Sequence, residues 1–197
     1  MGRWHRHNRH TGFTVTEVIV VTGLFILLLA GLMAMFLSGQ TSYVTTDAYL
    51  QVQQEARRAF DNMVREVHGA GGTIAAAAGQ LDFQTALGYN LALAGCVANQ
   101  VCWGAKDSSG ADQPGWSLRY RVSGTQLLRD IRDAGGVTQA GTRVLANYVD
   151  SAATTFNWNS GERIVTMTFQ ARYQNAQIAG GAQTIGPLTA RVRLRNP

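Results

Sequence analysis

The hydrophobic and polar residues of this chain fall into successive regions with different periods. Residues 18–37 form an apolar run without a charge, and residues 45–68 repeat apolar positions at steps of three and four. Beyond residue 72, apolar and polar residues alternate in short runs between turn residues. A period near 3.6 predicts a helix with one apolar face, whereas a period of two predicts half-buried strands. We therefore expect an α+β fold, with one long N-terminal helix followed by antiparallel strands.

The apolar run, residues 18–37, reads VIVVTGLFILLLAGLMAMFL. A helix of this length spans about 30 Å, the thickness of the hydrocarbon core of a bilayer. The run is longer than the apolar part of a secretory signal, which has about 7–15 residues, and no clean cleavage site follows it. Arginines precede the run and none follows closely, so the N-terminus should lie in the cytoplasm. We expect a single membrane-spanning segment with the rest of the chain outside.

Charge is unevenly distributed along the 197 residues. The chain has 17 Lys+Arg and 12 Asp+Glu, a formal net charge of +5. Three of the arginines, Arg3, Arg6 and Arg9, lie within residues 1–12 together with three of the four histidines. A His-rich tract can bind metal, but before an apolar helix a basic targeting leader is the favoured interpretation. Without the leader the chain has 14 basic and 12 acidic residues, so its apparent basicity says little about nucleic acid.

Glu17 is the only charged residue in the stretch 10–46. A carboxylate beside a membrane segment is costly and suggests a function, although one at headgroup depth can also reach water. It belongs to the sequence GFTVTE, residues 12–17, which resembles the processing site of type IV prepilins. In that family prepilin peptidase cuts after the glycine, the new N-terminal residue is usually an N-methylated Phe, and the fifth mature residue is Glu. The resemblance implies cleavage between Gly12 and Phe13.

The resemblance also implies roles for these residues. Gly12 has no side chain, so a peptidase can approach the scissile bond closely. Glu17 of one subunit would pair with the Phe13 amine of a neighbour, since opposite charges attract strongly in a low-dielectric helix bundle. The expected partners are prepilin peptidase, other major and minor pilins, an inner-membrane assembly platform and the lipid bilayer. The chain would first be a single-pass inner-membrane protein and then part of a periplasmic or cell-surface filament.

The second half of the predicted helix, residues 45–72, is amphipathic. Its apolar stripe should pack on a sheet and its charged face should be solvated. The glycines at 69, 71 and 72 should end the helix. The stretch 51–72 resembles the same region of PilW-type minor pilins and of J-type pseudopilins of type II secretion. The stripe consists of Val52, Ala56, Ala59, Phe60, Met63, Val64 and Val67.

Residues 73–197 should form an extracytoplasmic, β-rich head, and their order of elements resembles the PilW-like head. The residues Ile74–Gly79 are expected to be a loop. The fold class is thus α+β, the type IV pilin fold, divided into a leader (1–12), a membrane and filament-core helix (13–44), an amphipathic helix (45–72) and the head. Strands are expected at 81–85, at 116–122 and 126–131 as a hairpin, at 163–173 and at 188–194, with a strand or short helix at 143–149.

Cys96 and Cys102 are the only cysteines of the chain. Outside the cytoplasm a pair at this spacing is expected to form a disulfide that fixes a surface loop. A zinc site would need two further ligands, and the spacing excludes a redox CxxC motif. We expect neither a metal nor another cofactor.

Arg191, Arg193 and Arg195 alternate along the last predicted strand and share one face. The favoured interpretation is a solvated edge strand on which arginines prevent unwanted strand pairing. The other interpretation is a stripe that contacts phosphates, which makes DNA a possible but less favoured partner.

The chain has none of the common signatures of an enzyme. It lacks the P-loop, the G-x-S-x-G elbow and the H-E-x-x-H motif, so we expect no catalytic residues. The favoured function is that of a PilW-like minor pilin, a structural and assembly subunit of a type IV pilus. The alternatives are a minor pseudopilin of a type II secretion system, a DNA-binding or adhesive pilus-tip subunit, and a signal-anchored periplasmic enzyme with an uncut N-terminus.

Overall fold

The protein is described here by a computed structural model that covers residues 12–174 and 182–194. The helix of this part of the chain, α1 (Val15–His68), has 54 residues. It begins after Thr14, whose Oγ1 accepts a hydrogen bond from the backbone N–H of Glu17 at 3.3 Å. Threonine caps a helix in this way because the first amides have no partner inside it.

Internal contacts divide the chain into two compact units, Met1–Val44 and Thr45–Pro197. In the first unit, every residue from 12 to 44 is exposed, including large apolar side chains such as Leu27 and Met35. By its length and composition α1 can cross a membrane. An apolar surface this extensive needs lipid or protein to cover it.

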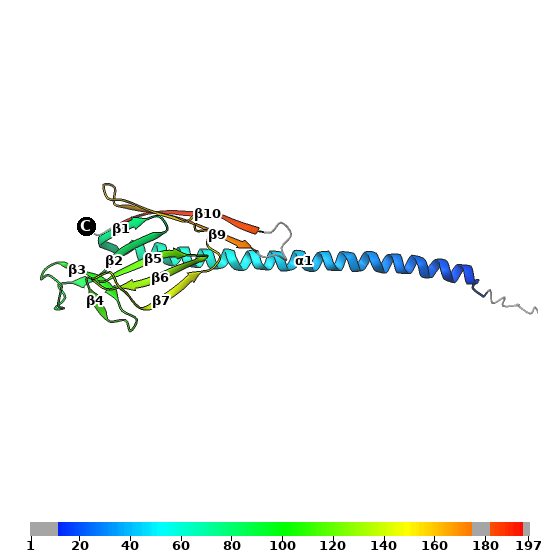
Figure 1. The fold of residues 1–197 in the computed structure, drawn as a ribbon, viewed down its shortest axis with the longest axis horizontal. Helices are drawn as coiled ribbons and strands as arrows, with labels where there is room; N and C mark the ends of the chain where they lie inside the picture. Colours follow the sequence, from blue (N-terminus) through cyan, green and yellow to red (C-terminus); the bar gives the residue numbers. More distant parts are fainter. Residues whose placement is uncertain (1–11, 175–181, 195–197) are drawn as a thin grey trace, which may run out of the picture. The chain divides into compact units, whose positions relative to one another are not determined.

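The second unit places its strands in two antiparallel sheets (Figure 1). The first sheet has the strand order β4-β3-β2-β5-β6-β7, with β1 paired to β2, and the second has the order β10-β9-β8. The strands of the first sheet are β1 (Ala70–Ala77), β2 (Gln80–Tyr89), β3 (Val101–Lys106), β4 (Asp112–Pro114), β5 (Ser117–Ser123), β6 (Gln126–Arg132) and β7 (Thr138–Ala146). Those of the second are β8 (Thr155–Asn159), β9 (Ile164–Gln174) and β10 (Ala182–Arg193).

The core lies between the later part of α1 and the inward faces of both sheets. Both sheets contribute aromatic and aliphatic side chains, for example Phe83 and Tyr120 from the first and Met167 and Phe169 from the second. Apolar residues of α1 recur at one helical face, so a single stripe enters this core and the predicted packing on a sheet is confirmed. The buried members of the stripe are Val52, Ala56, Ala59, Met63 and Val67, and Phe60 and Val64 are partly buried beside them.

This arrangement is the predicted α+β class and matches the type IV pilin fold. The hairpin expected at 116–122 and 126–131 is present as β5 and β6, with Ser117 paired to Arg132 and Ser123 to Gln126. For residues 143–149 the sequence predicted either a strand or a short helix, and the structure shows the end of strand β7 there.

The prediction of a loop at Ile74–Gly79 is wrong, because most of this segment belongs to β1. Ala76 pairs with Leu81 of β2, and residues 78 and 79 form the two-residue turn between the strands. Gly79 has a φ of +69°, the left-handed conformation that such tight hairpin turns need. Cross-strand pairing therefore overrides the weak strand preference of alanine.

The glycines expected to stop the helix have different roles. Gly69 follows His68, but Gly71 and Gly72 lie in β1, where the register of its pairing with β2 shifts. A Cβ on Gly71 would lie 2.1 Å from the indole of Trp103, and Gly72 has a φ of +60°. The glycines therefore form a bulge that leaves room for an indole from β3.

Candidate processing and assembly sites

The predicted scissile bond lies at the exposed start of the chain's helix. Gly12 and Phe13 precede α1 in a non-helical segment, and Phe13 is 78% exposed. No heavy atom lies within 4 Å of the position that a Cβ on Gly12 would occupy. A peptide bond in such a segment is accessible to a protease, whereas one inside a helix must first unfold. The leader arginines lie outside the described residues.

Glu17 occupies the first turn of α1, where it also suits the start of its own helix, a feature that was not predicted. The Thr14 and Thr16 hydroxyls lie 3.1 Å apart, and Thr14 caps the Glu17 amide. Thr14-x-x-Glu17 has the spacing of a capping box, and a carboxylate in the first turn interacts favourably with the helix dipole. The T-x-x-E spacing in the sequence could have indicated this helix start. This local role is compatible with pairing to an amine, because both uses need an ionised carboxylate.

The disulfide expected between Cys96 and Cys102 is present. Cys102 is buried in β3, and Cys96 belongs to the loop between β2 and β3. The bond joins this loop to the sheet. The residues 83–105 around it carry no charge.

Arg191 and Arg193 are exposed on β10, which ends the order of the second sheet among the described strands. The predicted edge position is therefore confirmed. An Arg191 guanidinium nitrogen lies 3.6 Å from a carboxylate oxygen of Glu162, and both side chains are more than half exposed. Such surface pairs contribute about 0–1 kcal/mol to stability. Arg195 lies outside the described residues.

Two glutamates of α1 bind the first sheet or the residue that follows it, so the expectation of a merely solvated charged face is wrong for these two, although the other charged side chains of the face are exposed. Glu66 accepts hydrogen bonds from the Tyr120 hydroxyl at 2.6 Å and from Arg129 Nε at 2.9 Å. Glu55 Oε1 accepts bonds from the backbone N–H of Asn147 at 2.7 Å and from its side-chain amide at 2.8 Å. Burial of Tyr120, followed by the negative charge of Glu66, raises the pKa of the phenol above its usual range.

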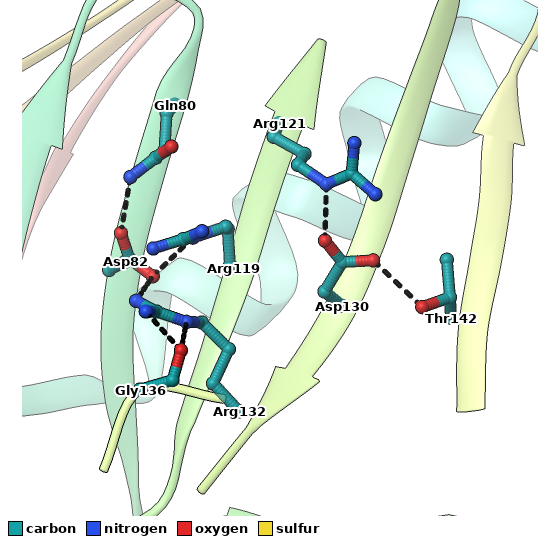
Figure 2. A network of polar contacts seen from close by, with 8 residues as sticks. All are labelled: Gln80, Asp82, Arg119, Arg121, Asp130, Arg132, Gly136 and Thr142. Carbon is teal, nitrogen blue, oxygen red and sulfur yellow. Dashed lines mark hydrogen bonds and ion pairs between the residues drawn. The ribbon is translucent and has the colours of Figure 1, made fainter. Parts of the chain in front are cut away.

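The opposite face of the first sheet carries a second polar network (Figure 2). Asp82 accepts hydrogen bonds from Arg119 Nε at 2.8 Å and from Arg132 Nη1 at 3.1 Å. Asp130 is fully buried and is bound by Arg121 and by the Thr142 hydroxyl. The figure shows these two clusters with the ribbon of α1 behind the sheet.

The alternation of the strands explains this network. Leu118 and Tyr120 of β5 face the core, so Arg119 between them and Arg121 after Tyr120 face the other way. Leaving the buried Asp130 without its arginine would be costly, because its carboxylate would lose its compensating charge. We interpret the network as structural, since every member binds another member or the backbone.

Comparisons of the chain with protein families, curated proteins and solved structures gave no match. Within the described residues, no three His, Cys, Asp or Glu side chains are grouped so that they could hold a metal ion.

Proposed function

We propose that the chain is a PilW-like minor pilin, a structural and assembly subunit of a type IV pilus. The observation that carries the proposal is the position of the GFTVTE sequence, residues 12–17, directly at the exposed start of α1. The same helix continues into an uncharged, mostly apolar and exposed segment, residues 18–37, and later packs on an antiparallel sheet. Each of these features has a use in a subunit that moves from a membrane into a filament.

The proposed sequence of events begins with insertion into the inner membrane, with the basic leader in the cytoplasm. Prepilin peptidase hydrolyses the bond between Gly12 and Phe13 and frees an amine, which is then methylated. The amine keeps its positive charge near neutral pH, and Glu17 of a neighbouring subunit neutralises it. Apolar helix surfaces then exchange lipid for other helices, while the disulfide-containing head stays outside.

A minor pseudopilin of a type II secretion system remains the second candidate, because residues 51–72 resemble both groups. The two share the processing site, the helix and the proposed use of Glu17. Loss of the chain in its own organism separates them: a pilus subunit is needed for surface filaments, whereas a pseudopilin is needed for secretion of folded enzymes.

Assembly is tested with Glu17→Ala, made in a strain that lacks the native chain. The variant should insert into the membrane at normal levels but be strongly depleted from sheared filaments. Glu162→Ala is the matched control, because it removes an exposed carboxylate of the head with the same substitution. Equal amounts of both variants in the filament fraction would remove the proposed role of Glu17.

A further inference from the structure

A groove runs between α1 and the edge strand β7 of the first sheet. It consists of two adjoining hollows of about 310 and 440 Å³, and Leu145 of β7 lines both. On the helix side it is lined by residues from Gln51 to Glu66, and β7 ends the strand order of this sheet, next to β6 (Figure 1). Both walls belong to the same compact unit, Thr45–Pro197.

The acidic groups that line the groove are already engaged by the sheet. Glu66 binds Tyr120 and Arg129, so the charge of Arg129 is neutralised there. Glu55 accepts two hydrogen bonds from Asn147. These contacts hold the Glu66 carboxylate against the sheet and the Glu55 carboxylate against the residue that follows β7.

Three further side chains of the groove are arginines. Arg58 and Arg65 of α1 and Arg143 of β7 line it and are exposed. Among the described residues, no carboxylate lies within ion-pair distance of any of the three. A planar guanidinium binds a carboxylate through two parallel hydrogen bonds, so these side chains are suited to anionic groups.

The spacing of the arginines indicates the shape of their partner. Arg58 and Arg65 are seven residues apart on one face of α1, which is about 10.5 Å along the helix axis. Carboxylates seven residues apart on another helix repeat this distance. Leu145 lines both the hollow that contains Arg58 and the one that contains Arg65, and it provides an apolar contact there. Side-chain amides of the groove can form hydrogen bonds to peptide or side-chain groups; they belong to Gln51, Gln54 and Asn62.

Nucleic acid fits the groove less well. Its charge repeats about every 3.4 Å along each strand, much more densely than the arginines. The carboxylates of Glu55 and Glu66 also line the groove and would repel additional phosphates that have no arginine opposite them.

We propose that the groove binds an acidic amphipathic helix of a partner protein, with two carboxylates seven residues apart and an apolar residue between them. The proposal depends only on residues 51–147 of the second compact unit and not on the proposed function. In a filament the partner would be a neighbouring subunit with such a helix.

The test measures binding of a fluorescent alanine-based helical peptide to the full chain in neutral detergent micelles. The peptide carries Glu at positions i and i+7 and Leu at i+3. It should bind about tenfold more tightly than the same peptide with Gln at both positions, and more tightly than one with two adjacent Glu residues. A DNA duplex should bind less tightly than the first peptide.

The variants separate the groove from general charge. Arg58→Glu and Arg65→Glu should each weaken binding of the first peptide about tenfold, since each loses an attraction and adds a repulsion. Arg57→Glu is the control, because Arg57 is exposed on α1 but lies outside the groove. Equal losses in all three variants, equal binding of the Gln peptide, or tighter binding of DNA would each overturn the proposal. Unchanged melting temperatures establish that the variants are folded.

Discussion

The hydroxyl of Tyr120 on β5 donates a 2.6 Å hydrogen bond to the carboxylate of Glu66 on α1. The two residues are 54 positions apart in the chain, and the bond joins the helix to the middle of the first sheet. Arg129, directly opposite Tyr120 on β6, neutralises the same carboxylate. This polar contact thus helps to fix the position of the helix on the sheet, and its contribution can be tested through stability.

Tyr120→Phe should destabilise the head by about 1–2 kcal/mol, because it removes one hydrogen bond to a charged acceptor while keeping the ring. The pKa of Tyr120 is raised in the folded protein, so the folded state holds the phenol proton more tightly than the unfolded state. Stability from this group is therefore present below about pH 10 and is lost as the pH rises further. Denaturant unfolding between pH 8 and 11 should show a smaller alkaline loss in the variant; an unchanged slope would contradict the assignment.

Asp107 should titrate far below an ordinary carboxyl group. Hydrogen bonds from the Ser109 hydroxyl, the Gln113 amide and the Ala111 N–H lower its pKa from 3.8 to about 2. The lowered value means that its contribution to stability is present above about pH 4 and is lost as the pH falls through about 2. A carboxyl ¹³C titration by NMR should report this midpoint, and a value near 4 would show that the turn does not form as described.

Removing the disulfide should destabilise a small part of the head. The double variant Cys96→Ala, Cys102→Ala should lose about 2 kcal/mol, as chain entropy gives for a loop this short. Protease cleavage within residues 90–101 should become faster, whereas cleavage elsewhere should change little. Treatment of the native chain with a reductant provides a comparison without substitution. Equal cleavage of the oxidised and reduced loop would contradict the view that the bond fixes it.

Gly71→Ala should lower the free energy of unfolding by about 1–3 kcal/mol, because the new methyl group would overlap the Trp103 ring. Gly161→Ala serves as the control, since its Cβ would have only an ordinary contact, 3.5 Å from Asn159 Oδ1. The double variant Gly71→Ala, Trp103→Ala should lose less stability than the sum of the losses in the two single variants. Additive losses in thermal unfolding would show that the indole does not occupy this space.

Features with a local pattern could be predicted from the sequence. The buried stripe of α1 follows from the 3.6-residue period, and the β5–β6 hairpin follows from alternation around Ser123 and Gly124. The disulfide followed from the expected compartment and the presence of one cysteine pair.

Features that depend on strand order could not be predicted. The partners Arg119 and Arg132 of Asp82 are 37 and 50 positions away, so their pairing requires knowledge of which strands are neighbours. The contact of Gly71 with Trp103 has the same origin, since it needs β1 and β3 to lie together around β2. Strand β8 was missed because five residues give too few alternations to stand out.

Whether residues 12–17 form a prepilin processing site is decided by intact-mass spectrometry of the membrane-purified chain. Gly12→Val should block cleavage, whereas Gly2→Val, the same change within the leader, should not. For the native chain we expect the mass of residues 13–197 with one methyl group on Phe13, and the uncut mass in cells without prepilin peptidase. An intact leader in cells with the peptidase, or cleavage near Ser38–Gln40, would contradict it.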